Sequence, residues 1–549
     1  MTAVLRRGCV VLMVLTAAVV GGVDHLAPVP AGAAASSQTP SDTVTVDVRD
    51  NVFAPKRVEI VPGTTVRWVN HGRSRHNVVP NRGSDFGSNI PADGRYEFTF
   101  SEPGTYAYYC SLHGAPGVGQ RGTVVVVDPA AAHEDRSTSN ARRRGGTLRV
   151  PDDFPTIQQA VDAAKPGALV LVAPGVYHEA ITVGPKQHDI VIRGEDRNET
   201  IVDGEFSEEP GHENGFKVFA DGVAIENITA RNFKTNGFFW TGVRGYRGSY
   251  LNAIRNGDYG IFAFDSVDGQ FDHSYAAGSP DAGFYIGQCF PCNAVIIDVE
   301  AEWNGIGYSG TNSGGNLVIA RSSFHDNRVG IVPNSGTGEA LYPQHGTTIV
   351  GNEVYSNNNA STGAIEIAEI AIGNGILVAG GNENVVTRNL VYDHDIAGIG
   401  VIALPETIID PDNPEAIDFD AKRNTVRSNV VRDSARFDLL LVSTLKTATD
   451  DGRNCFADNA FETSLPSDLE ALVPCTGEPV AGFENDLVTF NELLGGVKPP
   501  GVDYRTASLP DLPQLENMPR AKTARPRPAT KGATIVVRLA TVKLPDATR

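Results

Sequence analysis

A short frame centred on glycine recurs through the middle of the chain and constrains the fold more than any other feature. Its glycines lie 23, 22, 25, 45 and 23 residues apart, and 45 is about two periods. A unit of this length cannot bury its apolar face alone, so the units must stack. The copies are Y-G-I-F-A-F, A-G-F-Y-I-G, N-G-I-G-Y-S, V-G-I-V-P-N, N-G-I-L-V-A and A-G-I-G-V-I, with Gly260, Gly283, Gly305, Gly330, Gly375 and Gly398 as their glycines.

Asparagine also recurs at fixed positions in these units. Two segments show this pattern: N-E-N-V-V-T-R-N at residues 382–389 and R-N-T-V-R-S-N at residues 423–429. Asparagine side chains at an equivalent turn can stack and hydrogen-bond from coil to coil. A similar ladder is predicted for four residues spaced 23 apart, and we favour it over a calcium site there: Asp258, Asp281, Asn304 and Asn327.

The segment before the repeats predicts a helix. Thr156 followed by Gln159 is a capping box, and Ile157, Ala160, Val161 and Ala164 then share one helical face. Short apolar runs at residues 169–172 and 181–183 follow. This order resembles the N-terminal cap of a parallel β-helix. Together with the repeats, it is similar to pectate-lyase-like proteins over about residues 147–464. The resemblance implies a right-handed parallel β-helix, and it does not imply an activity.

A second constrained region contains Cys110 and His113. A Pro-Gly turn starts a Tyr-rich strand that ends at Cys110, and a Gly/Pro loop leads into another strand at residues 123–127. A thiolate at a strand end and an imidazole in the next turn can share one metal ion. Two histidines, one cysteine and a weak axial group make a trigonal blue-copper site, so a second histidine must come from the same sheet.

That histidine is present upstream. Apolar residues alternate over residues 58–69, with a Pro-Gly break, and predict two strands before His76. The combined pattern resembles the cupredoxin (plastocyanin-like) family over about residues 44–127. The resemblance implies that His76, Cys110 and His113 are copper ligands and that Asn77 braces the loop near the sulfur.

The resemblance departs from the family at the axial position. The family places Met there, whereas this chain has Gln120, and its methionines are Met1, Met13 and Met518. Glutamine substitutes for Met in stellacyanin-like sites, so we expect Gln120 to be the axial ligand of one type 1 copper ion. The alternative is a loop glutamine beside a three-coordinate or absent copper. His71 is interpreted as a solvated loop residue.

Length and charge limit the organisation of the 549 residues. Such a chain is too long to fold around one hydrophobic core, so two or more domains are expected. A net charge of −19 argues against a nucleic-acid partner. Arg6 and Arg7, an apolar run and an A-x-A site indicate a secretory signal peptide and no transmembrane anchor. The predicted divisions are a signal peptide at 1–35, a cupredoxin at 42–128, a linker at 129–146, a β-helix at 147–464 and a C-terminal extension with a flexible, Pro-rich, cationic tail at 465–549.

The cysteines agree with export. With Cys9 in the signal peptide and Cys110 assigned to copper, four cysteines remain. Cys455 and Cys475 are predicted to form a disulfide in an oxidising compartment. For Cys289 and Cys292, a local disulfide is favoured over a second metal or redox site.

The predicted β-helix suggests carbohydrate chemistry without naming a catalytic residue. Trp240 and Trp303 are candidates to stack on sugar rings, whereas Phe262, Phe264 and Phe284 are expected to fill the coil interior. Lyases of this fold need a base beside calcium-binding carboxylates, and calcium on the β-helix is retained as an alternative cofactor. The weak acid or base candidates are Arg244, Arg247, Arg255, Arg321, Arg328, His325-Asp326 and Asp393-His394-Asp395.

We therefore expect an exported all-β protein, a cupredoxin sandwich tethered to a parallel β-helix, secreted or periplasmic. The first functional hypothesis is electron transfer to an unidentified redox partner, with the β-helix docking a polysaccharide, the cell wall or a partner. The second is carbohydrate-active chemistry of a lyase or epimerase type. The third is copper handling, because the β-helix also resembles periplasmic accessory proteins of nitrous-oxide reductase maturation.

Overall fold

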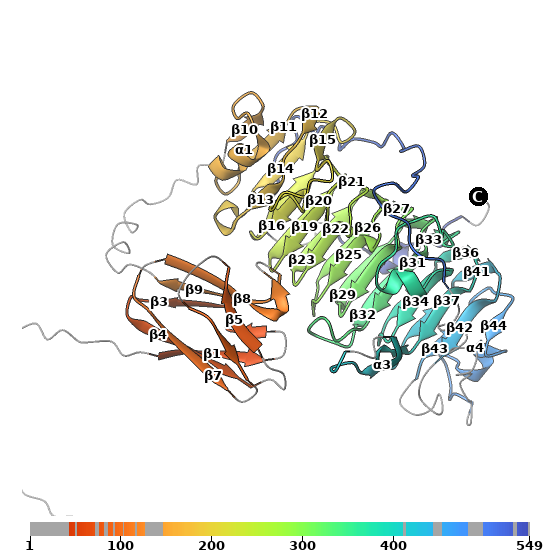
Figure 1. Cartoon of the computed structure of the whole chain (residues 1–549). Coiled ribbons are helices and arrows are strands. Elements are labelled where there is room, and N and C mark those ends of the chain that lie inside the picture. The colour runs from red at the N-terminus through yellow and green to blue at the C-terminus, as the bar shows by residue number, and fades with distance from the viewer. Residues whose placement is uncertain are drawn as a thin grey trace, which may run out of the picture.

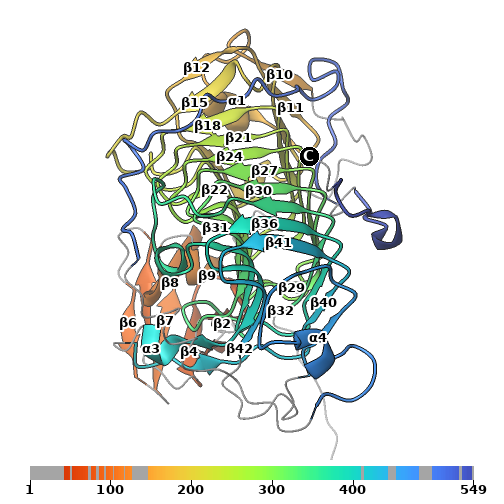
Figure 2. The ribbon, with the colours of Figure 1, turned by 90° about the vertical axis from the view of Figure 1, so that its right-hand side faces the viewer.

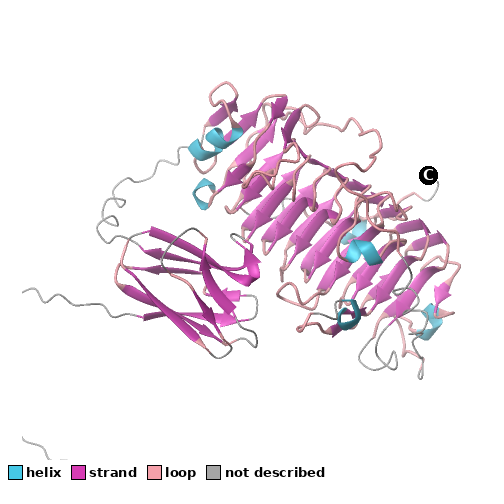
Figure 3. Ribbon diagram, viewed as in Figure 1, coloured by secondary structure: helices cyan, strands magenta, loops and turns pink. Residues whose placement is uncertain are grey.

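The chain folds into two β domains, as Figures 1 and 3 show. The computed structural model describes residues 43–49, 52–71, 76–81, 86–91, 94–102, 104–115, 118–126, 146–409, 413–442, 453–480, 498–530 and 535–546. The predicted signal peptide and nearly all of the predicted linker lie outside these ranges. Within them, no helix is long and apolar enough to cross a membrane. The expected all-β fold class is confirmed.

The N-terminal domain is a sandwich of two sheets. The first has strand order β2-β1-β4-β7 and the second β3-β9-β8-β5-β6. The strands are β1 (Thr43–Arg49), β2 (Val52–Ala54), β3 (Arg57–Ile60), β4 (Thr64–Asn70), β5 (His76–Pro80), β6 (Ser88–Ile90), β7 (Arg95–Phe100), β8 (Gly104–Ala115) and β9 (Val118–Val126).

Period-two alternation explains why these segments form strands around one core. In β4, every second residue from Thr64 to Asn70 is buried, because alternate side chains point to opposite faces of a strand. Trp68 at the centre is fully buried and its ring contacts Phe86, Phe100 and Tyr108. This aromatic core holds the second sheet rigidly against the first.

The larger domain is a parallel β-helix whose successive coils stack three parallel sheets. Its first sheet contains β10 (Thr147–Val150), β11 (Leu169–Val172), β14 (Val191–Gly194), β17 (Val223–Glu226), β20 (Arg244–Ser249), β23 (Val267–Asp272), β26 (Ala294–Ile297), β29 (Gly314–Ala320), β32 (His345–Val350), β35 (Val385–Thr387), β40 (Thr425–Arg427) and β43 (Cys455–Ala457).

The second sheet is seen in Figure 2 as a column of strands. It contains β12 (Gly175–Tyr177), β15 (Thr200–Asp203), β18 (Thr229–Arg231), β21 (Asn252–Ile254), β24 (Tyr275–Ala277), β27 (Glu300–Glu302), β30 (Ser323–His325), β33 (Glu353–Tyr355), β36 (Leu390–His394) and β41 (Val430–Ser434).

The third sheet carries the glycine frames. It contains β13 (Ile181–Val183), β16 (Phe216–Val218), β19 (Phe238–Thr241), β22 (Tyr259–Phe264), β25 (Ala282–Gly287), β28 (Ile306–Thr311), β31 (Val329–Asn334), β34 (Asn374–Ala379), β37 (Ala397–Ile402), β42 (Phe437–Val442) and β44 (Ser464–Leu465). The other elements are β38 (Leu404–Pro405), β39 (Asp418–Phe419), α1 (Ile157–Ala163), α2 (Ile367–Ile370), α3 (Glu406–Ile409), α4 (Leu469–Leu472), and 3-10 turns at Pro185–Gln187 and Leu539–Thr541.

The predicted capping helix is α1. The Thr156 hydroxyl accepts a hydrogen bond from the Gln159 backbone N–H at 3.2 Å, as an N-cap residue does. Ile157, Ala160 and Val161 are fully buried on the face turned to the coils. The helix therefore closes the apolar interior at the N-terminal end of the stack.

Strand alternation corrects three aromatic assignments. Phe284 belongs to the main core, as expected. Phe262 and Phe264 do not: they alternate with core residues Ile261 and Ala263 and therefore lie on the outer face of the third sheet, in a separate aromatic cluster. Trp240 is wrong as a sugar-stacking candidate, because it is fully buried in the main core.

Asparagine ladders run along the stack. The Asn384 amide donates to Asn424, and Asn424 to Asn454, each at 3.0 Å. Asn389, Asn429 and Asn459 form a second ladder through contacts of 3.0 and 2.9 Å. The repeated Asn frames of the sequence thus mark stacked turns, as predicted.

The ladder predicted at residues 258, 281, 304 and 327 is half right. Asn304 donates to Asn327, and Asn327 to Asn357, each at 3.0 Å. In the coil before, the Ser279 backbone N–H donates to the Asn304 side chain, so the ladder passes through 279 and not through Asp281. The coil from 279 to 304 is longer than 23 residues, and constant spacing therefore misassigned Asp258 and Asp281.

Both predicted cysteine pairs are disulfides. Cys289 is bonded to Cys292 within one turn, and Cys455 to Cys475 across a 20-residue separation. The second bond holds the segment of α4 against β43 at the C-terminal end of the stack. Both sulfur atoms of Cys289 and Cys292 are occupied by this bond, so neither is free to bind a metal.

The prediction of a flexible cationic tail over residues 520–549 is wrong for residues 520–530 and 535–546, which lie along the β-helix. Arg193, fully buried, donates to the backbone carbonyls of Ala521 and Ala524 at 3.1 and 2.7 Å. Its guanidinium also pairs with Glu226 at 2.7 Å. Basic and Pro-rich composition suggested a solvated terminus, whereas buried side chains of the coils supply the donors that hold its backbone.

Candidate copper centre

Three of the predicted ligand residues meet in the second sheet of the sandwich. His76 begins β5, Cys110 lies in β8 and Gln120 lies in β9, and these strands are neighbours. The His76 Nδ1 atom is 2.8 Å from Gln120 Oε1 and 3.8 Å from Cys110 Sγ. All three residues are buried, each at most 1% exposed. An imidazole nitrogen, a thiol sulfur and an amide oxygen therefore converge.

Hydrogen bonds fix the direction of the Gln120 amide. Its Nε2 donates to the backbone carbonyls of Arg49 and Val52 at 3.0 and 3.2 Å. The oxygen of the same amide then faces His76. Gln120 therefore lies in a strand and not in a loop, with its amide held in place; its role as an axial ligand stays a prediction.

A local brace explains how the cysteine is held. Asn77 and Ser111 exchange two hydrogen bonds of 2.8 Å: the Asn77 amide donates to the Ser111 hydroxyl, and the Ser111 N–H donates to Asn77. Pairing of β8 with β9 shifts register between Tyr109 and Gly114. The segment after Cys110 therefore leaves the regular β8–β9 pairing. Asn77 holds the first residue of this segment, Ser111, in place, which is the role expected of Asn77.

His113 lies within β8, but its side chain is outside the described residues. The expectation that it completes the ligand set stays a prediction. His71 lies 3.5 Å from the Asp47 carboxylate and its side chain is 55% exposed, in agreement with a solvated position.

The strand of Gln120 also contacts the β-helix, beside which the sandwich lies in Figure 1. The next residue, Arg121, donates to the Thr241 hydroxyl at 3.2 Å, and Lys56 pairs with Asp265. Gly242, at φ +66°, lies so close to the guanidinium that a side chain there would overlap it. Burial lowers the pKa of Arg121, and Asp265 partly opposes this.

Three carboxyl groups near the third sheet have a pKa that burial raises. Burial, reinforced by Glu366, raises the pKa of Asp258 to about 7. Burial also raises the pKa of Glu339 to about 8, although the Tyr285 hydroxyl donates to its carboxylate. The pKa of Asp281 is raised well above its usual range for the same reason. Burial therefore favours the protonated form of each of these carboxyl groups.

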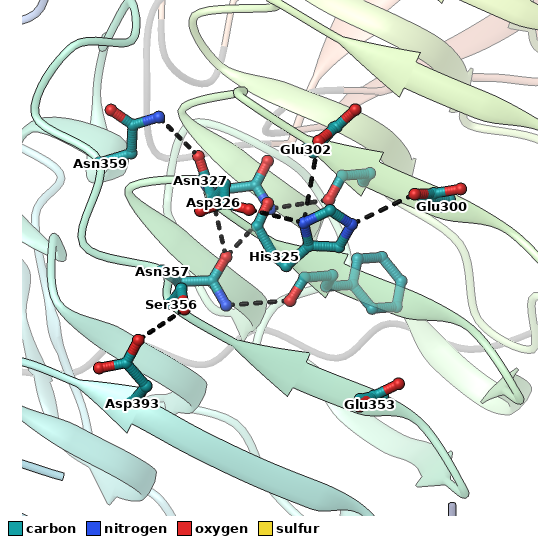
Figure 4. Close-up of polar contacts among 12 residues, drawn as sticks. Glu300, Glu302, His325, Asp326, Asn327, Glu353, Ser356, Asn357, Asn359 and Asp393 are labelled. Atoms are coloured by element: carbon teal, nitrogen blue, oxygen red, sulfur yellow. Dashed lines mark hydrogen bonds and ion pairs between the residues drawn. The ribbon is translucent and has the colours of Figure 1, made fainter. Parts of the chain in front are cut away.

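The second sheet presents a different cluster around His325 (Figure 4). Its Nδ1 is 2.8 Å from Asp326 and its Nε2 is 3.2 Å from Glu300. Burial opposes the charged imidazole, but these hydrogen bonds outweigh burial and raise the His325 pKa to about 9. His325-Asp326 was foreseen from sequence, whereas Glu300 and Glu302 were not, because only the coil period brings them beside it.

The other acid or base candidates have structural partners. His394 is 1% exposed, and burial lowers its pKa to about 3. The arginines bind fixed acceptors: Arg244 with Asp268, Arg247 with Glu226, Arg255 with the carbonyl of Arg505, Arg321 with Asp298 and Arg328 with the carbonyl of Ala368. None of these five geometries singles out a catalytic base.

Two family models match separate parts of the chain. Residues 41–127 match "Copper binding proteins, plastocyanin/azurin family", and residues 236–413 match "Right handed beta helix region". The second match and the three parallel sheets confirm the predicted β-helix. The first agrees with the convergence of His76, Cys110 and Gln120 in a sandwich.

Individual relatives also match either the copper-binding region or another part of the chain. A plastocyanin from Scenedesmus fuscus is 36% identical over 86 residues, which is 14% of this chain and 86% of the relative. An amicyanin from Paracoccus versutus is 33% identical over 14% of this chain and 64% of its own length. The chain spans only 26% of a pectinesterase/pectinesterase inhibitor from Arabidopsis thaliana, at 31% identity and over 22% of its own length.

Among solved structures, the β-helix is similar to the A-module of the mannuronan C-5 epimerase AlgE4 from Azotobacter vinelandii. The match covers 57% of this chain and 92% of the module at 14% identity, with a TM-score of 0.39. A similarity of this size carries no argument about activity. Through residues 41–127 the chain belongs to the plastocyanin/azurin family of copper-binding proteins, joined here to a right-handed β-helix region.

Proposed function

We propose that the protein is an exported electron-transfer protein whose N-terminal domain holds one type 1 copper ion. Its ligands are His76, Cys110 and His113, with Gln120 in the axial position. The observation that carries the proposal is that His76 Nδ1 lies 2.8 Å from Gln120 Oε1 and 3.8 Å from Cys110 Sγ in a buried, braced setting. Nitrogen, sulfur and a weak axial oxygen are the donors that a blue-copper site uses.

The chain's own residues limit rearrangement at this centre. The Gln120 amide is held by two backbone carbonyls, and Asn77 holds the start of the cysteine loop. When bound, copper supplies a one-electron couple, and a rigid donor set lets that couple exchange electrons with little movement. Two disulfides agree with an oxidising compartment and support secretion or a periplasmic location.

The test is a copper titration of the full chain followed by absorption spectroscopy and a redox titration. Intense visible absorption from thiolate-to-copper charge transfer, with reversible bleaching on reduction, is the expected result. A copper-loaded chain without that absorption would rule out the type 1 assignment.

A second function, carbohydrate-active chemistry on the β-helix, is favoured by the carboxyl groups of the third sheet. Burial raises the pKa of Asp258 to about 7 and that of Glu339 to about 8, and carboxyl groups with a pKa in this range suit proton transfer at neutral pH. Incubation with acidic polysaccharides should then release unsaturated sugars, for a lyase, or leave epimerised residues within the polymer, and Glu339→Gln should reduce either product. Unchanged polysaccharide with the wild-type chain would remove this function.

A further inference from the structure

The cluster in Figure 4 brings together side chains from successive coils. Glu302 ends β27 and His325 ends β30, and the two residues are direct partners in the parallel register. Asp326 follows His325 at the turn. One ligand atom from each of Glu302, His325 and Asp326 lies within 4.8 Å of the others. An imidazole nitrogen and two carboxylate oxygens thus face one small volume.

Surrounding residues orient these donors. Glu300 approaches His325 Nε2 at 3.2 Å, which leaves Nδ1 turned to Asp326 at 2.8 Å and to Glu302 at 3.8 Å. A histidine whose second ring nitrogen meets a carboxylate is the usual arrangement around a metal-bound imidazole. The Tyr275 hydroxyl donates to Glu302 from outside the cluster.

The position of the imidazole ring is also fixed by stacking. Tyr355, on the next strand, stacks on the His325 ring at 4.6 Å between centroids and 5° between planes. The His325 side chain is only 9% exposed, whereas that of Asp326 is 42% exposed. The cluster therefore has a rigid, buried side and an open side.

The charges and the open side favour a bound cation. Three carboxylates surround one imidazole, and the nearby Arg321 is already paired with Asp298. A groove of about 620 Å³ runs beside the cluster, lined by Glu300, Glu353 and residues of the C-terminal segment. Water or a ligand oxygen can reach the donors from the exposed side of Asp326.

We propose that Glu302, His325 and Asp326 bind one first-row divalent cation, of the class of Mn²⁺, Co²⁺ or Zn²⁺. Imidazole and carboxylate donors suit these ions, with Zn²⁺ binding more tightly than Mn²⁺. Three protein ligands leave positions open for water or for a substrate oxygen, the arrangement of a catalytic rather than a structural ion. The site lies on the second sheet and is separate from the copper centre.

Co²⁺ is the probe for this site, added to the copper-loaded full chain so that the cupredoxin ligands are occupied. Equilibrium dialysis with metal analysis should find one Co²⁺ per chain, displaced by Zn²⁺. Glu302→Gln and Asp326→Asn keep the side-chain shapes and should each weaken Co²⁺ binding more than about tenfold. Glu353→Gln, a carboxylate on the same sheet and groove but outside the three ligands, should bind Co²⁺ like the wild type.

Several outcomes would overturn the proposal. The wild-type chain retaining no Co²⁺ would do so, as would equal Co²⁺ binding by wild type and Glu302→Gln. Melting temperature and the copper spectrum report whether each variant is folded, independently of Co²⁺. A measurement without variants uses histidine-labelled wild-type protein: Mn²⁺ should broaden the His325 resonance and leave sharp that of His178, which follows β12, six strands away along the second sheet. Equal broadening of both would contradict the site.

Discussion

Replacing Gln120 by Met tests the copper centre most directly. The wild-type amide oxygen is a harder donor than a thioether, so it favours Cu(II), whereas sulfur favours Cu(I). The two side chains have similar length, and position 120 is 1% exposed, so the thioether should occupy the place of the amide oxygen 2.8 Å from His76 Nδ1. For a one-electron couple, tenfold in relative affinity is about 59 mV. A roughly hundredfold preference raises the potential by about 0.12 V.

The same change has a separate cost in stability. Met cannot donate to the carbonyls of Arg49 and Val52, and each lost hydrogen bond is worth about 1 kcal/mol. The copper-free variant should therefore lose about 2 kcal/mol of unfolding free energy. This loss is expected whether or not Gln120 binds copper, so denaturant unfolding of the copper-free proteins serves as the control.

Voltammetry of both proteins in one buffer measures the potential. A rise of about 0.1 V in the variant supports axial coordination by Gln120. Equal potentials, together with the expected loss of stability, would show that Gln120 only bridges strands and does not bind copper. The two measurements separate the role of the amide oxygen from that of the amide nitrogen.

Four further outcomes are expected. Cys110→Ser should abolish the visible copper absorption while circular dichroism and melting stay near wild type. Residues 145–549 expressed alone should melt cooperatively, since α1 caps the stack; an aggregated product would contradict the boundary. Glu226→Gln leaves two buried arginines without their carboxylate and should cost about 3–5 kcal/mol, with faster proteolysis of the tail. His394, with a folded pKa of about 3 against about 6.5 unfolded, stays neutral while the unfolded chain binds a proton. The free energy of unfolding is therefore highest, with respect to His394, above about pH 6.5 and falls by about 2 kcal/mol at pH 5. His394→Asn should remove this pH dependence of the unfolding free energy, measured by acid unfolding.

The sequence by itself determined the architecture of both domains. The glycine frames predicted stacked coils because a unit of about 23 residues has no other way to bury its apolar side. The paired Asn frames predicted ladders because equivalent turns lie one strand spacing apart. His76, Cys110 and Gln120 were predicted as ligands through the resemblance to cupredoxins, and the structure brings them together because β5, β8 and β9 are neighbouring strands.

Only the tertiary structure decided details that depend on the register between coils. One coil longer than 23 residues shifted the Asn304 ladder to Ser279 and away from Asp281. Strand alternation, counted from the true strand start, placed Phe262 outside the core. Glu302 and His325 meet because β27 pairs with β30, and donors buried in the coils hold the C-terminal segment. Such contacts join residues far apart in the chain, and no local pattern records them.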